Sequence, residues 1–226
     1  MKRNILLVEG SSDKWFFISL LEKIGLNVDV FPPKDPEIQE KSKGNGADGA
    51  LSALEKHLSY VKNGQIDNLG IVVDADFIEN KLGYTHRHKQ VSDILSKEGF
   101  FVIEKNTTDK GDTFQHTDAP SIKIGLWIMP DHSSQGMIEN LLIDSINGGL
   151  RKELLEKNID NAIESLEKTE EFKKQSIIFN STHLAKVRFN TWLTWQKKPE
   201  NCRFLTPACA LKEGWLNPEH DNIKAL

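Results

Sequence analysis

Short apolar runs alternate with amphipathic segments along the first 148 residues of the chain. The runs are bounded by glycine, proline or polar residues, and the predicted strands are residues 4–8, 27–31, 69–73, 100–104 and 122–129. Such short, strongly apolar runs are typical of strands that are buried on both faces of a sheet. Apolar residues at helical spacing predict helices at 13–24, 47–62, 86–98 and 137–145. Strands that alternate with helices predict an α/β fold with a mainly parallel sheet of four or five strands, flanked by helices.

The pattern changes after Gly148-Gly149. Residues 150–174 and 181–196 have helical, charged patterns, and the segment from 197 onward is rich in turn-forming residues. We therefore expect two parts, a sheet domain at 1–148 and a helical C-terminal extension at 149–226 that packs on it. Within the first part, residues 105–121 are polar and rich in Thr and Asp, which predicts a long loop.

Composition and charge indicate a globular protein. The 226 residues are 38% hydrophobic and 27% charged, with a net charge of −4. Acidic residues outnumber basic ones up to residue 180, and basic residues outnumber acidic ones after it. This distribution fits an acidic metal site combined with a basic extension, and it fits chance equally well. No apolar run reaches the about 18 residues that a membrane span requires, so none is expected.

Cysteine content and the N-terminus bear on the compartment. Cys202 and Cys209 are the only two cysteines, which are too few for a disulfide framework, and their spacing matches no common zinc pattern. The first apolar run is too short for the apolar region of a signal peptide. These features predict a cytoplasmic protein with reduced thiols.

Four carboxylates are placed at or near the ends of two predicted strands. Glu9 follows the strand 4–8, and Asp13 lies at the start of the next helix. Asp74 and Asp76 follow the strand 69–73. If the two strands are parallel neighbours, all four side chains emerge at the edge where open α/β sheets bind ligands. Close carboxylates repel each other unless they are protonated or share a cation, and oxygen ligands favour Mg²⁺ or Mn²⁺. An Asp-x-Asp in a loop, or an aspartate at a helix start, is common by itself; it is the combination that predicts a metal site.

These motifs resemble those of a known family. Val8-Glu9-Gly10-x-x-Asp13 together with Val73-Asp74-Ala75-Asp76 is similar to the Toprim domain of topoisomerases, primases and OLD-family nucleases, over about residues 3–145. The resemblance implies a Rossmann-like fold in which the glutamate and the Asp-x-Asp pair bind Mg²⁺ for phosphodiester chemistry. An acid at the position of Asp13 is a feature of the OLD-like nucleases. The chain departs from full OLD proteins because it carries no G-x-x-x-x-G-K-[ST] motif.

Two further acids enter through the same resemblance. Gly136-Met137-Ile138-Glu139 resembles the OLD segment in which a glutamate completes the metal site, although Glu139 alone also fits a surface acid in the first turn of a helix. The stretch from Gly125 to Asp131 resembles small standalone bacterial Toprim proteins. Asp131 follows a strand, as the other acids do, and is a second-tier ligand.

One cation is implied in the C-terminal extension. OLD-like nucleases carry a lysine after the Toprim core, near the scissile phosphate, and Lys186 occupies that place in chain order. Such a cation stabilises the negative charge of the transition state. Arg188 is the alternative candidate for this cation. If Lys186 has no functional role, it is a solvated lysine on the surface of a helix.

The resemblance therefore implies a Mg²⁺- or Mn²⁺-dependent nuclease that hydrolyses phosphodiester bonds, in DNA in preference to RNA, with two ions. One ion would be held by Glu9, Asp13 and Glu139, and the other by Asp74 and Asp76. Alternatively, Glu9 would exchange a proton with the leaving group. Lys186 is expected to neutralise charge on the phosphate. The alternative is a binding or regulatory subunit that works with a separately encoded ATPase, as in phage defence; a primase-type nucleotidyl-transfer enzyme ranks third. The sequence leaves open whether the chain forms a homodimer.

Overall fold

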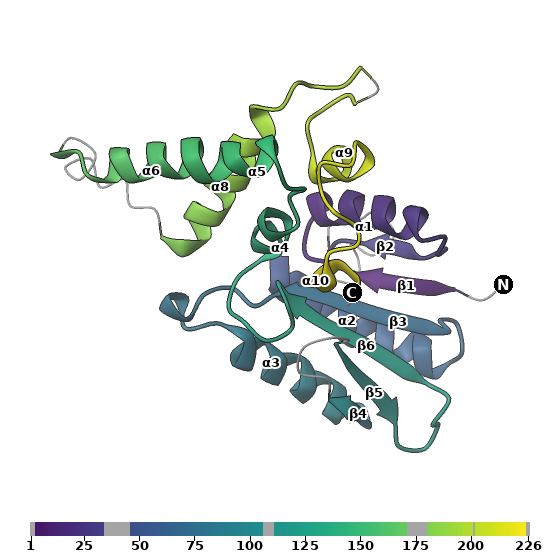
Figure 1. Cartoon of the computed structure of the whole chain (residues 1–226). Helices are drawn as coiled ribbons and strands as arrows, with labels where there is room; N and C mark the ends of the chain where they lie inside the picture. Colours follow the sequence, from purple (N-terminus) through teal and green to yellow (C-terminus); the bar gives the residue numbers. More distant parts are fainter. Residues whose placement is uncertain (1–2, 34–45, 106–110, 171–179, 201, 225–226) are drawn as a thin grey trace.

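A single mixed sheet with helices on both faces organises the protein (Figure 1). The computed structural model describes residues 3–33, 46–105, 111–170, 180–200 and 202–224. The predicted α/β class, with a mostly parallel sheet flanked by helices, is confirmed. Gly44 and Asn45, at the predicted entry to the second helix, lie outside the described residues.

The sheet has six strands in the order β2-β1-β3-β6-β5-β4. Their bounds are β1 Asn4–Leu7, β2 Asp29–Phe31, β3 Asn68–Asp74, β4 Phe100–Lys105, β5 Asp112–His116 and β6 Lys123–Met129. The strands β2, β1, β3 and β6 are parallel, and β5 and β4 extend the sheet in antiparallel fashion. The carboxyl ends of β1, β3 and β6 therefore lie side by side at one edge.

The strand β5 corrects the prediction of a continuous loop at 105–121 and of a sheet with four or five strands. Of its five residues, Phe114 is the one large apolar side chain, and it is buried with Phe100 of β4. The polar composition hides the strand because main-chain pairing with two neighbours does not require apolar side chains on both faces.

Helices cover both faces of the sheet. Their bounds are α1 Ser11–Lys23, α2 Gly46–Lys62, η2 Ile78–Asn80, α3 Tyr84–Lys97, α4 Ile138–Asp144, α5 Leu150–Glu153, η3 Leu154–Ile159, α6 Asp160–Glu167, α8 Ser181–Thr194, α9 Pro207–Lys212 and α10 Asp221–Lys224. Successive strand residues point to opposite faces. Thus Val72 belongs to the hydrophobic core that includes residues of α1, α4 and α8, whereas Ile71 and Val73 belong to the core that includes residues of α2 and α3.

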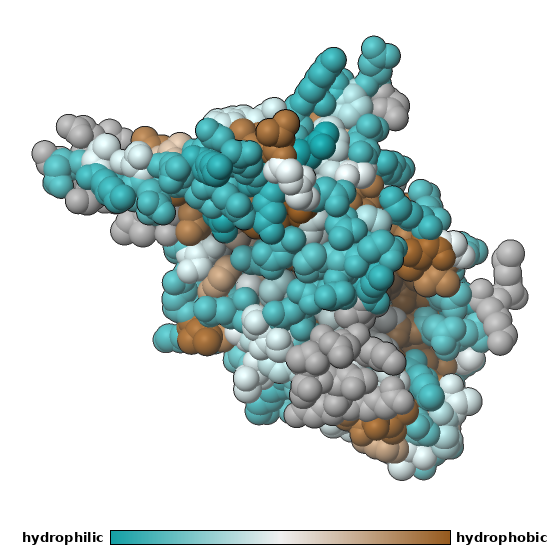
Figure 2. Space-filling view, in the orientation of Figure 1, coloured by the Kyte–Doolittle hydropathy of each residue, from teal (hydrophilic) through white to brown (hydrophobic). Residues whose placement is uncertain are grey.

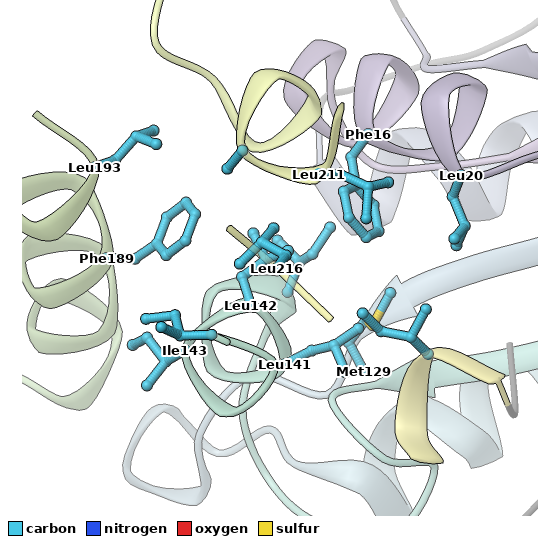
Figure 3. Close-up of a cluster of buried hydrophobic side chains, with 14 of the residues drawn as sticks. Phe16, Leu20, Met129, Leu141, Leu142, Ile143, Phe189, Leu193, Leu211 and Leu216 are labelled. Carbon is cyan, nitrogen blue, oxygen red and sulfur yellow. The ribbon is translucent and has the colours of Figure 1, made fainter. Parts of the chain in front are cut away.

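The C-terminal elements share a hydrophobic core with the sheet domain. In Figure 3, Phe189 of α8 and Leu211 of α9 lie around the same buried space as Phe16 of α1 and Leu142 of α4. All four side chains are buried. Complete burial of a side chain of this size contributes about 1.5–3 kcal/mol, so this contact holds α8 and its polar residues firmly on the sheet domain.

The exterior carries no continuous apolar face in the view of Figure 2, where hydrophobic side chains form small separate groups among hydrophilic ones. None of the helices formed by the described residues is long and apolar enough to cross a membrane.

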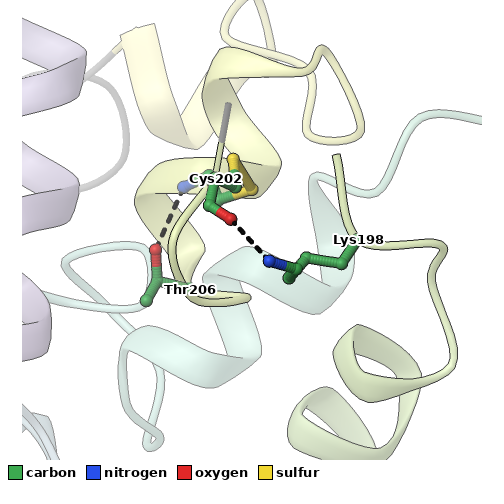
Figure 4. Close-up of a disulfide and its surroundings, with 4 residues drawn as sticks. Lys198, Cys202 and Thr206 are labelled. Atoms are coloured by element: carbon green, nitrogen blue, oxygen red, sulfur yellow. Dashed lines mark hydrogen bonds between the residues drawn. A yellow bond between two sulfur atoms is a disulfide. The ribbon is translucent and has the colours of Figure 1, made fainter. Parts of the chain in front are cut away.

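The two cysteines form a disulfide, Cys202–Cys209, beside the start of α9 (Figure 4). This corrects the expectation of reduced thiols. The hydroxyl of Thr206 accepts a hydrogen bond from the amide of Cys209 and caps α9, so Cys209 faces back toward the preceding loop. Neither thiol is free, which excludes zinc binding by the two in this state.

Candidate functional site

The carboxylate of Glu9 spans the gap between the ends of β1 and β3. Its Oε1 accepts a 2.8 Å hydrogen bond from the main-chain amide of Asp74. Leu7 pairs with Ile71 in the parallel register. Glu9 lies two residues beyond Leu7, and Asp74 lies three residues beyond Ile71. A Cβ built on Gly46, at the start of α2, would lie 3.7 Å from Oε2 of Glu9, so this oxygen faces α2.

Asp74 connects the end of β3 to the start of α4. Its Oδ1 accepts a 2.9 Å hydrogen bond from the amide of Ile138, which is one of the first amides of that helix. Such amides have no partner within the helix and favour negative charge. The contact brings Glu139, the next residue, toward the acids of the sheet edge.

Asp76 is held through both its main chain and its side chain. Its φ of 59° lies in the left-handed region, and two main-chain hydrogen bonds of 2.7 and 2.8 Å pair it with Gly136. Its Oδ2 accepts a 2.7 Å hydrogen bond from Nη2 of Arg87. Arg87 also donates from Nε to the carbonyl oxygen of Asp74 at 3.0 Å. The Asp-x-Asp segment therefore encloses a buried guanidinium.

Asp13 of α1 interacts electrostatically with Glu139 of α4, and Lys186 of α8 interacts with both. Burial raises the pKa of Asp13 to about 6, and the charge of Glu139 adds to the rise. Burial likewise raises the pKa of Glu139. The ammonium group of Lys186 opposes both shifts. Lys186 itself is exposed, so it lies beside these acids and remains accessible to a ligand.

Burial and mutual repulsion destabilise the ionised forms of the inner acids. Burial raises the pKa of Glu9 to about 7, against the lowering effects of the Asp74 amide and of Arg87. The pKa of Asp74 is raised by burial and then by the charges of Glu9, Asp13 and Glu139. A set of carboxylates this close and this poorly solvated favours a cation at its centre.

The carboxylate oxygens are suitable ligands for a divalent cation, but they are not arranged around a common point. Oε2 of Glu139 is buried and has no hydrogen-bond partner among the described residues. Glu9, Asp13 and Asp74 line one small cavity. In the part of the chain that the structure describes, no three His, Cys, Asp or Glu side chains are arranged as ready ligands. Binding would require rotation of these carboxylates toward a shared point.

Two predicted residues lie outside this cluster. Oδ1 of Asp131 accepts hydrogen bonds from the amides of Ser133 and Ser134 and from the Ser133 hydroxyl, all within the β6–α4 loop. Arg188 forms a two-bond ion pair with Asp160 at 2.7 and 2.8 Å. Between the two cations proposed from the sequence, Lys186 is the one that faces the acids.

A second polar cluster lies under the same edge. Nε2 of His88 lies 2.6 Å from Oδ2 of the buried Asp112, and Nε2 of His132 lies 3.4 Å from Oδ1. Burial alone would raise the pKa of Asp112, but the two imidazoles hold it well below its usual range. Nδ1 of His132 accepts a hydrogen bond from the amide of Ile128, so Nε2 carries the proton and faces the carboxylate. The cluster links α3, β5 and the β6–α4 loop.

Sequence reasoning missed the role of Arg87. Arg87 lies near the start of the predicted helix 86–98, yet its side chain is 3% exposed. One signal in the sequence pointed to a buried partner. A positive charge near the N-terminus of a helix is unfavourable because of the helix dipole, so a nearby acidic residue is expected to neutralise it. Asp112 carried no comparable signal, because the segment around it was predicted to be a loop.

Comparison with known proteins identifies a family but no activity. No curated protein and no solved structure matches the chain. A family model described as "Protein of unknown function (DUF3226)" matches residues 3–226. Because the match covers nearly the whole chain, this protein belongs to the DUF3226 family.

Proposed function

We propose that this protein is a Toprim-type, Mg²⁺- or Mn²⁺-dependent phosphodiesterase that cleaves nucleic acid, with DNA as the preferred substrate. The observation that carries the proposal is the convergence of Glu9, Asp13, Asp74 and Glu139 at the carboxyl edge of the parallel strands. Their separation along the chain is large, and their proximity is unfavourable without a cation. A purely structural cluster would be expected to pair each acid with a base, whereas Glu139 keeps a buried oxygen without a partner in the described region.

The proposed roles follow from position. Glu9, Asp13, Asp74 and Glu139 would hold the cation, which when bound polarises the phosphate and lowers the pKa of the attacking water. Hydrogen bonds from the amides of Asp74 and Ile138 orient Glu9 and Asp74, as outer partners orient metal ligands elsewhere. Alternatively, Glu9 does not bind the cation; burial raises its pKa to about 7, so that it can then release or accept a proton near neutral pH.

Lys186 supplies the positive charge toward the substrate. It is exposed, it lies beside Asp13 and Glu139, and α8 is fixed to the sheet domain through Phe189. An ammonium group in this place can bind a phosphate oxygen and stabilise the charge that develops during cleavage. The preference for DNA rests on the resemblance to OLD-like nucleases alone.

The second candidate is a subunit that becomes active only with a partner, such as a separately encoded ATPase. It is favoured by the small volume of the cavity at Glu9, Asp13 and Asp74 and by the absence of ready ligand geometry in the described residues. A partner that separates α1 from α4 would open the cluster. Under this reading the same carboxylates already bind the cation in the isolated protein, and the partner is needed to open the cluster to the substrate.

The deciding experiment is cleavage of supercoiled and linear plasmid DNA by the purified protein in EDTA, Mg²⁺ or Mn²⁺. Glu9→Gln is the test variant, and Glu55→Gln, an exposed acid on α2, is the matched control. Cleavage that requires metal and is lost only in Glu9→Gln supports the nuclease. No cleavage, together with a Mn²⁺-dependent rise in melting temperature of the wild type, supports the partner-dependent subunit. No cleavage and no metal effect refutes both.

A further inference from the structure

Arg87 is buried inside the cluster that the proposed function assigns to cations. Its Nη2 donates to Oδ2 of Asp76 at 2.7 Å, its Nε to the carbonyl oxygen of Asp74 at 3.0 Å and its Nη1 to Oε1 of Gln90 at 2.9 Å. All three nitrogens therefore have an acceptor. Withdrawal of the side chain would leave buried polar groups without partners, which is costly, so the guanidinium is a fixed part of this site.

We infer that Arg87 takes the place of one of the two expected metal ions, so that the site binds a single divalent cation through Glu9, Asp13, Asp74 and Glu139. Asp76 then serves the arginine and is not a metal ligand. This inference rests on the proposed function and deepens it. It changes the assignment expected from the Asp-x-Asp pattern, in which Asp74 and Asp76 together hold a second ion.

The first argument is the direction of Asp76. Glu9, Asp13 and Asp74 line the small cavity at the strand ends, and Asp76 and Glu139 do not. Oε2 of Glu139 has no hydrogen-bond partner among the described residues, whereas Asp76 is ion-paired with Arg87. The main chain of Asp76 is fixed by the paired hydrogen bonds with Gly136. Its carboxylate forms a 2.7 Å ion pair with a side chain that is 3% exposed. The carboxylate is therefore oriented and neutralised by the protein itself.

The second argument is repulsion between cations. A divalent ion placed between Asp74 and Asp76 would lie next to a guanidinium that contacts both residues. In a buried site this repulsion is weakly screened, and Arg87 cannot lose its charge as a lysine can. The charge of Arg87 also reaches Glu9, but Asp13 and Glu139 interact with Lys186, which is exposed and able to move.

The planar guanidinium also explains why an arginine suits this place. It supplies three directed donors to a main-chain carbonyl, a carboxylate and an amide at once, which an ammonium group on a flexible stem cannot do. In this arrangement the arginine holds the Asp74-Ala75-Asp76 segment in shape, whether or not an ion is bound. One metal ion, Arg87 and Lys186 then provide the positive charge of the site.

The test counts bound Mn²⁺ per chain by equilibrium titration, with free Mn²⁺ followed by electron paramagnetic resonance. We expect one ion in the wild type and one ion in Asp76→Asn, where the affinity is lower because the guanidinium of Arg87 has lost the carboxylate that neutralised it. Two ions in the wild type, one of them lost in Asp76→Asn, would overturn the inference and leave the proposed function intact. No bound ion in the wild type would instead refute the proposed metal site itself.

In a second variant we expect the number of bound ions to change. Arg87→Gln removes the charge and releases Asp76, so we expect a second Mn²⁺ to bind in the folded variant. Gln90→Ala is the matched control, because it removes one partner of Arg87 and leaves the ion pair with Asp76; it should bind one ion. Melting curves establish which variants fold, and Asp76→Asn decides the question if Arg87→Gln does not. A folded Arg87→Gln that still binds one ion would contradict the inference.

Discussion

The main-chain amide of Asp74 donates a 2.8 Å hydrogen bond to Oε1 of Glu9. This single contact joins the ends of two parallel strands and places two acids against each other in a buried position. The hydrogen bond favours the ionised form of Glu9, while burial opposes it more strongly and raises its pKa to about 7. A main-chain hydrogen bond therefore holds the two residues together, while the charges of their carboxylates repel each other.

Replacement of Glu9 separates these two effects. Glu9→Gln keeps an oxygen acceptor for the Asp74 amide and removes a charge, so the melting temperature of the metal-free protein should stay constant or rise. Glu9→Ala leaves the amide without its acceptor and should cost about 1–3 kcal/mol of folding free energy. Urea unfolding in EDTA measures both variants. A Glu9→Gln variant as unstable as Glu9→Ala would show that the charge itself is needed for the fold.

The metal-free protein should lose stability as the pH rises through neutrality. Burial raises the pKa of Glu9 from 4.5 to about 7 and the pKa of Asp13 from 3.8 to about 6. A group that binds its proton more tightly in the folded state stabilises the fold below its unfolded pKa, and this contribution is lost as pH passes the folded value. For Glu9 the loss is at most roughly 3 kcal/mol between about pH 4 and pH 8.

Melting temperatures in EDTA across this range measure the effect. Glu9→Gln should flatten the decline, since the variant has no proton to lose at this position. Mn²⁺ binds the deprotonated acids, so the rise in melting temperature that it causes should grow over the same pH interval. An equal decline in the wild type and in Glu9→Gln would mean that other groups dominate the pH dependence.

Lys186 and Arg188 should differ in what they support. Lys186→Met removes the ammonium group that we propose stabilises the phosphate charge during cleavage, so we expect cleavage to fall by about 10²-fold or more while Mn²⁺ remains bound. Arg188→Gln breaks the pair with Asp160, which should lower stability and leave the rate per folded molecule unchanged. Single-turnover cleavage and melting curves on both variants provide the comparison. The reverse result would assign the phosphate contact to Arg188.

Asp131 should behave as a turn residue. Burial would raise the pKa of this carboxyl, but hydrogen bonds from Ser134 and Ser133 lower it below the usual range. Asp131→Asn keeps the Oδ1 acceptor and should fold almost normally, whereas Asp131→Ala should lose about 1–3 kcal/mol of stability. Neither change should alter Mn²⁺ affinity in titrations. A loss of affinity in Asp131→Asn would return the residue to the set of ligands.

The sequence by itself determined the parallel part of the sheet and the edge at which the acids gather. Apolar runs and helical spacing are local properties, and Glu9 and Asp74 follow such runs directly. Parallel neighbours end at the same edge, so the approach of these two residues follows if the two strands are neighbours, a condition that the sequence left open and the structure meets. The placement of Asp13 at the start of α1 followed from the same local pattern.

Only the tertiary structure decided how each charged group is used. The amide of Ile138 reaches Asp74 across 64 positions of sequence, and Arg87 turns inward to Asp76 rather than outward to a ligand. Asp131 turns into its own loop, and β5 forms in a segment with little apolar pattern. These outcomes depend on which donors and acceptors lose water together when the elements pack, and a buried polar group must find its partner there. That pairing is a property of three-dimensional packing and has no local signal along the chain.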